Sequence, residues 1–219
     1  MARVGRRRPV LALIRFVVAL EMLLLPLWAG AMCVRPGPLE PEISHLKSAV
    51  FRLWRASWAV ALAAVVTVAL AALAEEPMVG PALESQVAAL GFLALLAGVA
   101  GVTDRRLGPR AAQVATALIG WLILAGIVLV GPLADLMQGP AQSAIVRFAA
   151  HANPLVVAER GLGLDWLHQS LTYRLTPLGE SYAYLLGDLA WWKTALGHFF
   201  VGSGLIVFGA TGFGRRFIR

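Results

Sequence analysis

The stretch VATALIGWLILAGIVLVGPLA, residues 114–134, decides the fold of this chain. It carries no Asp, Glu, Lys or Arg along its whole length. The apolar core of a bilayer is about 30 Å thick, and a helix of about 20 residues is long enough to cross it. A helix on the surface of a soluble protein needs a polar face, which these residues lack. The stretch therefore predicts a transmembrane helix.

Three other apolar stretches predict further spans, over residues 56–74, 87–102 and 195–213. The composition agrees, since 59% of the residues are hydrophobic and only 14% are charged. Soluble domains have about 25% charged residues. We therefore expect an all-α fold, a polytopic transmembrane helix bundle that forms a single membrane domain over residues 1–219.

The positions of Lys and Arg predict which way the spans run, because short cytoplasmic loops are rich in these residues. If the span at 56–74 starts inside the cell, the loop that follows it has three Glu and no Lys or Arg, and becomes external. Ten basic residues then become cytoplasmic. They are Arg35, Lys47, Arg52, Arg55, Arg105, Arg106, Arg110, Arg215, Arg216 and Arg219.

Residues 9–34 form a fifth apolar stretch of a different kind. Arg15 and Glu21 interrupt it, and Pro26 removes a backbone donor from any helix that contains it. If this stretch crossed the membrane, the four arginines within residues 3–8 would lie outside the cell, against the rule that Lys and Arg are retained in the cytoplasm. We therefore expect an N-terminal re-entrant or interfacial helix in the cytoplasmic leaflet, with both chain termini in the cytoplasm.

Two connections are expected to lie along the membrane surface. In residues 42–55 apolar side chains recur at helical spacing between basic ones, which predicts an in-plane helix that leads into the next span. Residues 135–194 are semi-polar and too apolar to be disordered, so we expect an external amphipathic segment there.

Glu21 and His198 are the candidate polar residues inside the membrane. An ionisable side chain in an apolar helix is costly and is a functional candidate by default. The alternative for Glu21 is a surface position, or a partner on a neighbouring segment. Arg15 cannot be that partner, because it lies about 240° around the helix from Glu21 and about 9 Å along it. The alternative for His198 is an interfacial histidine, since no second histidine occurs in a span to complete a haem site.

Asp165 and His168 form a candidate polar face in the external segment. They predict either an acid/base or metal pair, or the solvated face of an amphipathic helix. Cys33 is the single cysteine, and the chain has no GxxxxGK[ST] phosphate-binding loop. We expect no enzymatic activity, no metal and no cofactor.

From Asn153-Pro154-Leu155 to its end, the chain resembles the C-terminal third of ABC-2-type exporter permeases. The features that carry the resemblance are the Asn-Pro start, the external amphipathic segment, the aromatic pair Trp191-Trp192 before the last span, and the basic tail Gly214-Arg215-Arg216. The resemblance implies an export permease with cytoplasmic termini. The family has six spans, whereas four or five are expected here.

These features predict a permease-type subunit that works in export with a separate cytoplasmic ATPase. Its docking surface for that ATPase is expected to be basic and to consist of Lys47, Arg52, Arg55, Arg105, Arg106 and Arg110. The alternative is a non-catalytic integral membrane subunit of a respiratory or photosynthetic complex, with lipid or quinone contacts.

The location and partners follow from the same features. Small residues such as Ala94, Gly98 and Gly202 predict close helix association, within the chain or with a partner. We expect the cell inner membrane as the location. The expected partners are the lipid bilayer and either other subunits or a second copy of the chain, but not nucleic acid.

Overall fold

Helices make up almost all of the described part of the chain. The structure is a computed structural model that describes residues 4–34, 42–74, 78–163 and 190–210. Within these ranges the helices are α1 (Val4–Cys33), α2 (Glu42–Leu73), α3 (Val79–Leu107), α4 (Pro109–Asp135), α5 (Pro140–Ala152), α6 (Pro154–Gly161) and α9 (Trp191–Ala210). Four of them, α1 to α4, contain segments long and apolar enough to cross a membrane. The predicted all-α, polytopic fold is confirmed.

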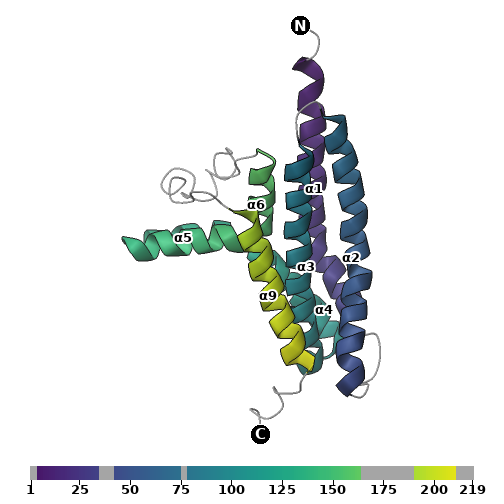
Figure 1. Ribbon diagram of the computed structural model, residues 1–219. Coiled ribbons are helices and arrows are strands. Elements are labelled where there is room, and N and C mark those ends of the chain that lie inside the picture. The colour runs from purple at the N-terminus through teal and green to yellow at the C-terminus, as the bar shows by residue number, and fades with distance from the viewer. Residues whose placement is uncertain (1–3, 35–41, 75–77, 164–189, 211–219) are drawn as a thin grey trace.

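Helix α3 is the centre of the bundle and packs against α1, α2, α4, α6 and α9 (Figure 1). Every residue from Gly91 to Gly98 is buried. Helix α9 lies very close to α3, because a Cβ atom added to Gly98 would lie 2.5 Å from the carbonyl oxygen of Gly202. A Cβ atom on Gly202 would in turn overlap the backbone of Ala94. The predicted close association through small residues is confirmed, and here it is within the chain.

A single residue, Gly108, connects α3 to α4. Its φ of +78° lies in the left-handed region that glycine adopts without strain, and its N–H donates to the carbonyl oxygen of Asp104 at 3.1 Å. Pro109 then occupies the first position of α4, where a missing N–H costs nothing. This tight turn brings Arg105 and Arg110 to the same end of the bundle.

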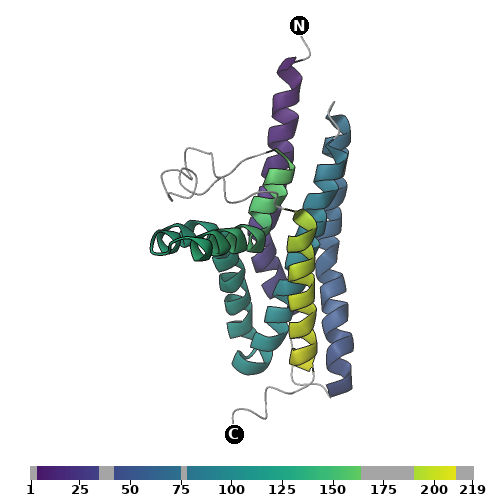
Figure 2. The ribbon, with the colours of Figure 1, turned by 60° about the vertical axis from the view of Figure 1, so that its left-hand side comes forward.

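Helix α1 differs from the re-entrant or interfacial helix expected for residues 9–34. It is continuous from Val4 to Cys33 and packs lengthwise against α2, α3 and α4 (Figure 2). Pro26 lies inside it, buried against Gly120 of α4. The Trp121 indole donates to the carbonyl oxygen of Leu23 at 3.1 Å, one turn before Pro26. Pro26 leaves the carbonyl of Met22 without its helical donor, and the neighbouring helix supplies a donor to the next carbonyl along the chain.

Helix α2 also differs from its prediction. Residues 42–55 were expected to lie in the membrane plane, but they continue in line with the span as one helix of 32 residues. No helix-breaking residue separates the two parts, because neither Gly nor Pro occurs between Glu42 and Leu73.

Helix α9 corresponds to the predicted span at 195–213, of which residues 211–213 lie outside the described ranges. It runs lengthwise beside α3 and is not among the four candidate spans found in the described residues. Within the described ranges, five helices therefore run along the bundle, an odd number. As a result, α1 begins and α9 ends at opposite ends (Figure 1). The cytoplasmic position expected for both chain termini stays a prediction.

Helix α5 lies crosswise to the bundle, and α6 turns back along α1 and α3 (Figures 1 and 2). Asn153 joins them and is completely buried. Its side-chain oxygen accepts from the N–H groups of Leu155 and Val156 at 3.1 and 3.2 Å, which caps α6. Its amide donates to the carbonyl oxygen of Leu124 in α4 at 2.6 Å. Asn153 thus attaches the predicted external segment to the bundle.

Candidate functional site

Glu21, Gln86 and Thr67 form a polar cluster between α1, α3 and α2. The Gln86 amide donates to Oε2 of Glu21 at 2.9 Å and lies 3.5 Å from the hydroxyl oxygen of Thr67. The Thr67 hydroxyl donates to the carbonyl oxygen of Ala63, one turn earlier in α2. Gln86 and Thr67 are buried. The partner that Glu21 needs if α1 crosses the membrane is therefore a glutamine, not a basic residue.

The cluster keeps unused hydrogen-bonding capacity. Oε1 of Glu21 and Oε1 of Gln86 are both buried and have no hydrogen-bond partner in the described structure. A buried polar atom without a partner costs about 1–3 kcal/mol, so such atoms mark places where a further donor is expected. The cluster can accept a hydrogen bond from a hydroxyl, a water molecule or a cation.

Glu159 of α6 is a second buried carboxylate, only 1% exposed, and neither of its oxygens has a hydrogen-bond partner among the described residues. Burial raises the pKa of Glu159 to about 7, and the positive charge of Arg15 opposes that rise. The Arg15 guanidinium donates instead to the carbonyl oxygen of Leu162, from Nε at 3.2 Å and from Nη2 at 2.9 Å. Arg15 thus caps the C-terminus of α6 beside a buried acid.

Sequence reasoning missed Glu159. The signal that could have found it is an acidic residue that directly follows the apolar run Leu155–Ala158 in a helix with buried neighbours. The run alone does not show that α6 packs against α3, and that contact is what removes the carboxylate from water.

An apolar groove of about 490 Å³ lies between α4, α5 and α9, with one wall residue, Leu95, from α3. Two buried polar side chains of α9, Thr194 and His198, line it. His198 contacts the ring of Phe92 in α3, and its Nε2 lies 3.1 Å from the carbonyl oxygen of Ala152. His198 is therefore at a junction of three helices, not in contact with Glu21.

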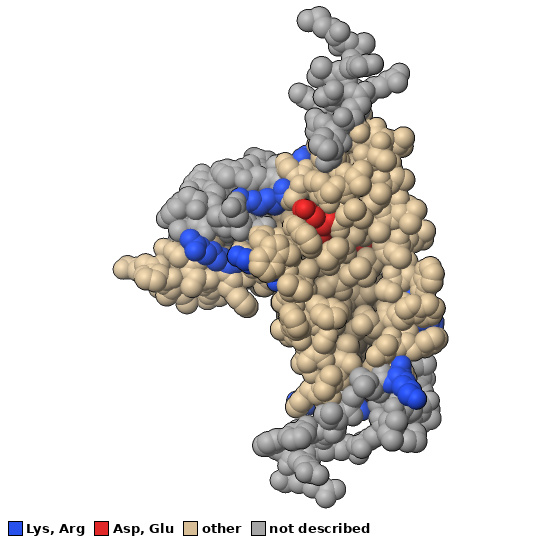
Figure 3. All heavy atoms as spheres, viewed as in Figure 1, with Lys and Arg blue, Asp and Glu red and all other residues tan. Residues whose placement is uncertain are grey.

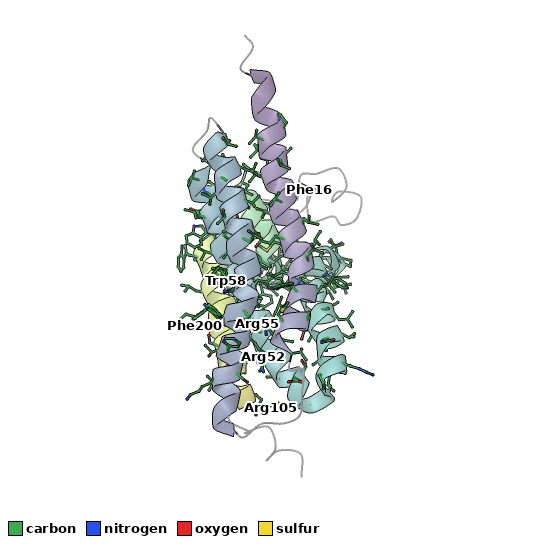
Figure 4. The ribbon with its side chains drawn as sticks, turned by 90° about the vertical axis from the view of Figure 1, so that its right-hand side faces the viewer. Phe16, Arg52, Arg55, Trp58, Arg105 and Phe200 are labelled. Carbon is green, nitrogen blue, oxygen red and sulfur yellow. The ribbon has the colours of Figure 1, made fainter. Side chains whose placement is uncertain are left out.

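The predicted docking residues gather at the end of the bundle where α2 begins, α3 ends and α4 begins. Arg52, Arg55 and Arg105 lie below Trp58 in Figure 4. Arg52 and Arg105 are half-buried, and Arg52 donates to the Ser48 hydroxyl at 3.2 Å. Lys47, Arg55, Arg106 and Arg110 are exposed.

Basic side chains also appear beside α5 and α6, and a broad uncharged surface separates them from that end (Figure 3). Arg147 of α5 and Arg160 of α6 are exposed there. Exposed apolar side chains also surround the bundle. Phe16 and Phe200 lie on opposite sides of it (Figure 4), and both they and Leu62 are more than 60% exposed. Such a belt is suited to lipid.

Asp165 and His168, the predicted external polar face, lie outside the described residues. Within the described ranges, no group of three or more His, Cys, Asp or Glu side chains is placed to hold a metal ion.

Comparison of the chain with known protein families, with curated proteins and with solved structures finds no match.

Proposed function

We propose that this chain is a non-enzymatic, permease-type subunit of the cell inner membrane that works in export with a separate cytoplasmic ATPase. The observation that supports the proposal is the gathering of basic side chains from α2, α3 and α4 at one end of the bundle. A positive surface built by three helices favours a cytoplasmic partner with an acidic face, because complementary charge speeds and orients docking.

The charge distribution also orients the bundle. The end that carries Lys47, Arg105 and Arg110 faces the cytoplasm in our proposal, since basic residues near span ends are retained there. The connection between α2 and α3 contains Glu75 and Glu76 but no Lys or Arg. The helix ends on either side of it, Leu73 and Val79, lie at the opposite end of the bundle. Helices α5 and α6 then belong to the outer half.

Two further features support a transport role. The chain has no GxxxxGK[ST] loop, so any ATP hydrolysis that drives export has to take place on another chain. The cluster of Glu21, Gln86 and Thr67 places polar groups from three helices inside an otherwise apolar bundle. Polar groups at such positions commonly mark substrate or ion pathways.

The test is purification of the tagged chain from its host in mild detergent, with identification of the proteins that accompany it. We expect an ATPase with the wild-type chain. The double variant Arg106→Glu, Arg110→Glu is expected to lower its recovery by about tenfold, which corresponds to about 1.4 kcal/mol of binding free energy. The matched control is Arg160→Glu, which reverses an exposed charge at the opposite end and leaves the recovery unchanged.

Unchanged recovery of the ATPase with the double variant would contradict the proposed docking surface. Recovery of cytochrome or quinone-linked subunits in place of an ATPase would favour the alternative function, a non-catalytic subunit of a respiratory or photosynthetic complex.

A further inference from the structure

The groove between α4, α5 and α9 has a polar end and an apolar end. Lys193 and Val201 both line it and lie eight residues apart on α9, so the groove extends about 12 Å along that helix. The polar end contains Lys193 and His151, and the apolar end contains Ile123 and Leu95. The groove therefore changes from polar to apolar along the bundle axis. This order matches a membrane lipid, which has a polar head group and an apolar tail.

Helix α5 marks the level of the polar end. It lies crosswise to the bundle, and Phe148, which lines the groove, is 72% exposed (Figure 2). A short helix in this orientation is typical of the membrane interface. Trp191 and Trp192 begin α9 at the same level, and tryptophan is enriched at that interface. The polar end of the groove is thus suited to a lipid head group, and the apolar end is suited to a hydrocarbon chain.

The hydrogen bonding of His198 shows that one of its ring nitrogen atoms needs a hydrogen-bond donor from a ligand. A carbonyl oxygen can only accept, so the Nε2 atom that faces the carbonyl oxygen of Ala152 at 3.1 Å carries a proton. His198 is 7% exposed among apolar side chains, where an uncharged ring is favoured. Its Nδ1 atom is then an acceptor, and this atom is buried and has no partner in the part of the chain that the structure describes.

Thr194 presents a second unpartnered group on the same face of α9. It lies four residues before His198, which places the two side chains one above the other on the helix. Thr194 is 3% exposed, and no described residue forms a hydrogen bond with its hydroxyl oxygen. A single hydroxyl group that donates to Nδ1 of His198 and accepts from the Thr194 hydroxyl satisfies both residues.

We propose that the groove is a binding site for a membrane amphiphile that carries a free hydroxyl group on an apolar body. Its hydroxyl donates to Nδ1 of His198 and accepts from Thr194, and its apolar part lies against Ile123, Leu95 and Val201. The volume of about 490 Å³ is within the range of small-molecule sites and accommodates a ring or a glycerol unit with the first part of an alkyl chain.

The experiment uses the full chain in phosphatidylcholine nanodiscs, because this lipid has no free hydroxyl. The probe is 4-decylphenol, and 4-decylanisole is its matched control, which has the same body with the hydroxyl methylated. Binding is measured from the dependence of the thermal unfolding midpoint on probe concentration. We expect the phenol to bind at least about tenfold more tightly than the anisole, because the anisole leaves Nδ1 unpartnered.

Three variants locate the site. A Cβ atom at Gly197 or at Gly126 meets no atom within 4 Å, and both residues line the groove. Gly197→Leu therefore adds a side chain to the groove from a position where its Cβ meets no neighbour, and we expect it to weaken phenol binding by at least about tenfold. Gly204→Leu is the matched control, since Gly204 lies in similar open space two turns further along α9 and outside the groove. Thr194→Val is expected to weaken binding severalfold.

Equal binding of the phenol and the anisole would overturn the proposal, because the groove would then be an apolar cleft without hydroxyl recognition. Equal binding of the phenol by the wild type and Gly197→Leu would also overturn it. Two further probes distinguish the source of the hydroxyl. Binding of a decyl benzoquinol points to an isoprenoid quinol, and binding of 1,2-dioctanoylglycerol points to a glycerolipid. Failure of both would contradict the proposal.

Discussion

Gln86 determines how Glu21 is accommodated inside the bundle. Its amide donates to the carboxylate from a helix that is 65 residues further along the chain, and no basic residue replaces it in that role. A neutral donor satisfies one carboxylate oxygen without bringing a second charge into an apolar environment. The bond also fixes the register of α1 against α3, because a shift by one turn would separate the two side chains.

Replacement of Gln86 by Leu tests this role. The variant leaves Glu21 buried without its donor, so we expect the free energy of unfolding to fall by about 1–3 kcal/mol. The measurement is reversible unfolding in mixed micelles. The control is Gln113→Leu at an exposed position of α4, which is expected to change the free energy by less than about 0.5 kcal/mol. An unchanged free energy in Gln86→Leu would show that the hydrogen bond does not stabilise the bundle.

Glu159 predicts a pH dependence of stability. Burial raises its pKa from the ordinary value of 4.5 to about 7. The folded state therefore holds the proton more tightly than the unfolded state, and the stabilisation is complete below pH 4.5. It is lost as the pH rises through about 7, because the ionised carboxylate is buried without a hydrogen bond.

Glu159→Gln keeps the shape of the side chain and removes the titration. We expect the thermal unfolding midpoint of the wild type to fall between pH 5 and pH 8, and that of the variant to change less over the same range. Glu84→Gln, at a partly exposed position of α3, is the control and retains the wild-type dependence. Parallel pH curves for the wild type and Glu159→Gln would contradict the assignment.

At the scale of helices, α1 shows how a proline and an acid are tolerated in one apolar helix. Two indoles connect it to its neighbours. Trp121 of α4 donates to the carbonyl oxygen of Leu23, and Trp28 of α1 donates to the carbonyl oxygen of Ala56 in α2 at 3.0 Å. These contacts need α1 to lie along the bundle, antiparallel to α2. A helix on the membrane surface could not make them.

The direction of α1 predicts the position of the N-terminus. In the structure α1 begins at the end of the bundle opposite Gly108 (Figure 1). We therefore expect alkaline phosphatase fused ahead of Met1 to be active outside the cytoplasm. A cysteine that replaces Gly108 is expected to resist a membrane-impermeant thiol reagent in intact cells, whereas one at Gln142 in α5 reacts.

If the fusion is inactive and the cysteine in Gly108→Cys stays unlabelled, the N-terminus and residue 108 both lie on the cytoplasmic side. That result would contradict the direction of α1. The chain in which Cys33 is replaced by Ser is the background for the labelling, because Cys33 is the only natural thiol.

At the scale of the whole molecule, the bundle separates its packing surfaces from its lipid-facing surfaces. Ala and Gly of α3 face α9, where the backbones touch. Large apolar side chains such as Leu62 and Val65 of α2 are 67% exposed and point away from the bundle. In a membrane, small residues allow close packing between helices, whereas large apolar residues are equally stable against lipid. The predicted second copy or partner subunit stays a prediction.

The sequence by itself determined the helical membrane class, because that depends only on local composition. A charge-free stretch such as residues 114–134 has one stable conformation in a bilayer, whatever its neighbours. The close packing at Gly98 and Gly202 was also predictable, since a missing side chain is a local property. Glu21 was identified for the same reason, as an acid in an apolar stretch.

Only the tertiary structure decided which residues meet. Gln86 became the partner of Glu21, Glu159 became buried, and Thr194 and His198 came to line one groove. The charge count disfavoured a crossing by residues 9–34, but packing against α2, α3 and α4 placed α1 along the bundle. The physical reason is that hydropathy measures transfer of a segment into the membrane, whereas hydrogen-bond partners, burial and cavities depend on contacts between segments far apart in the chain.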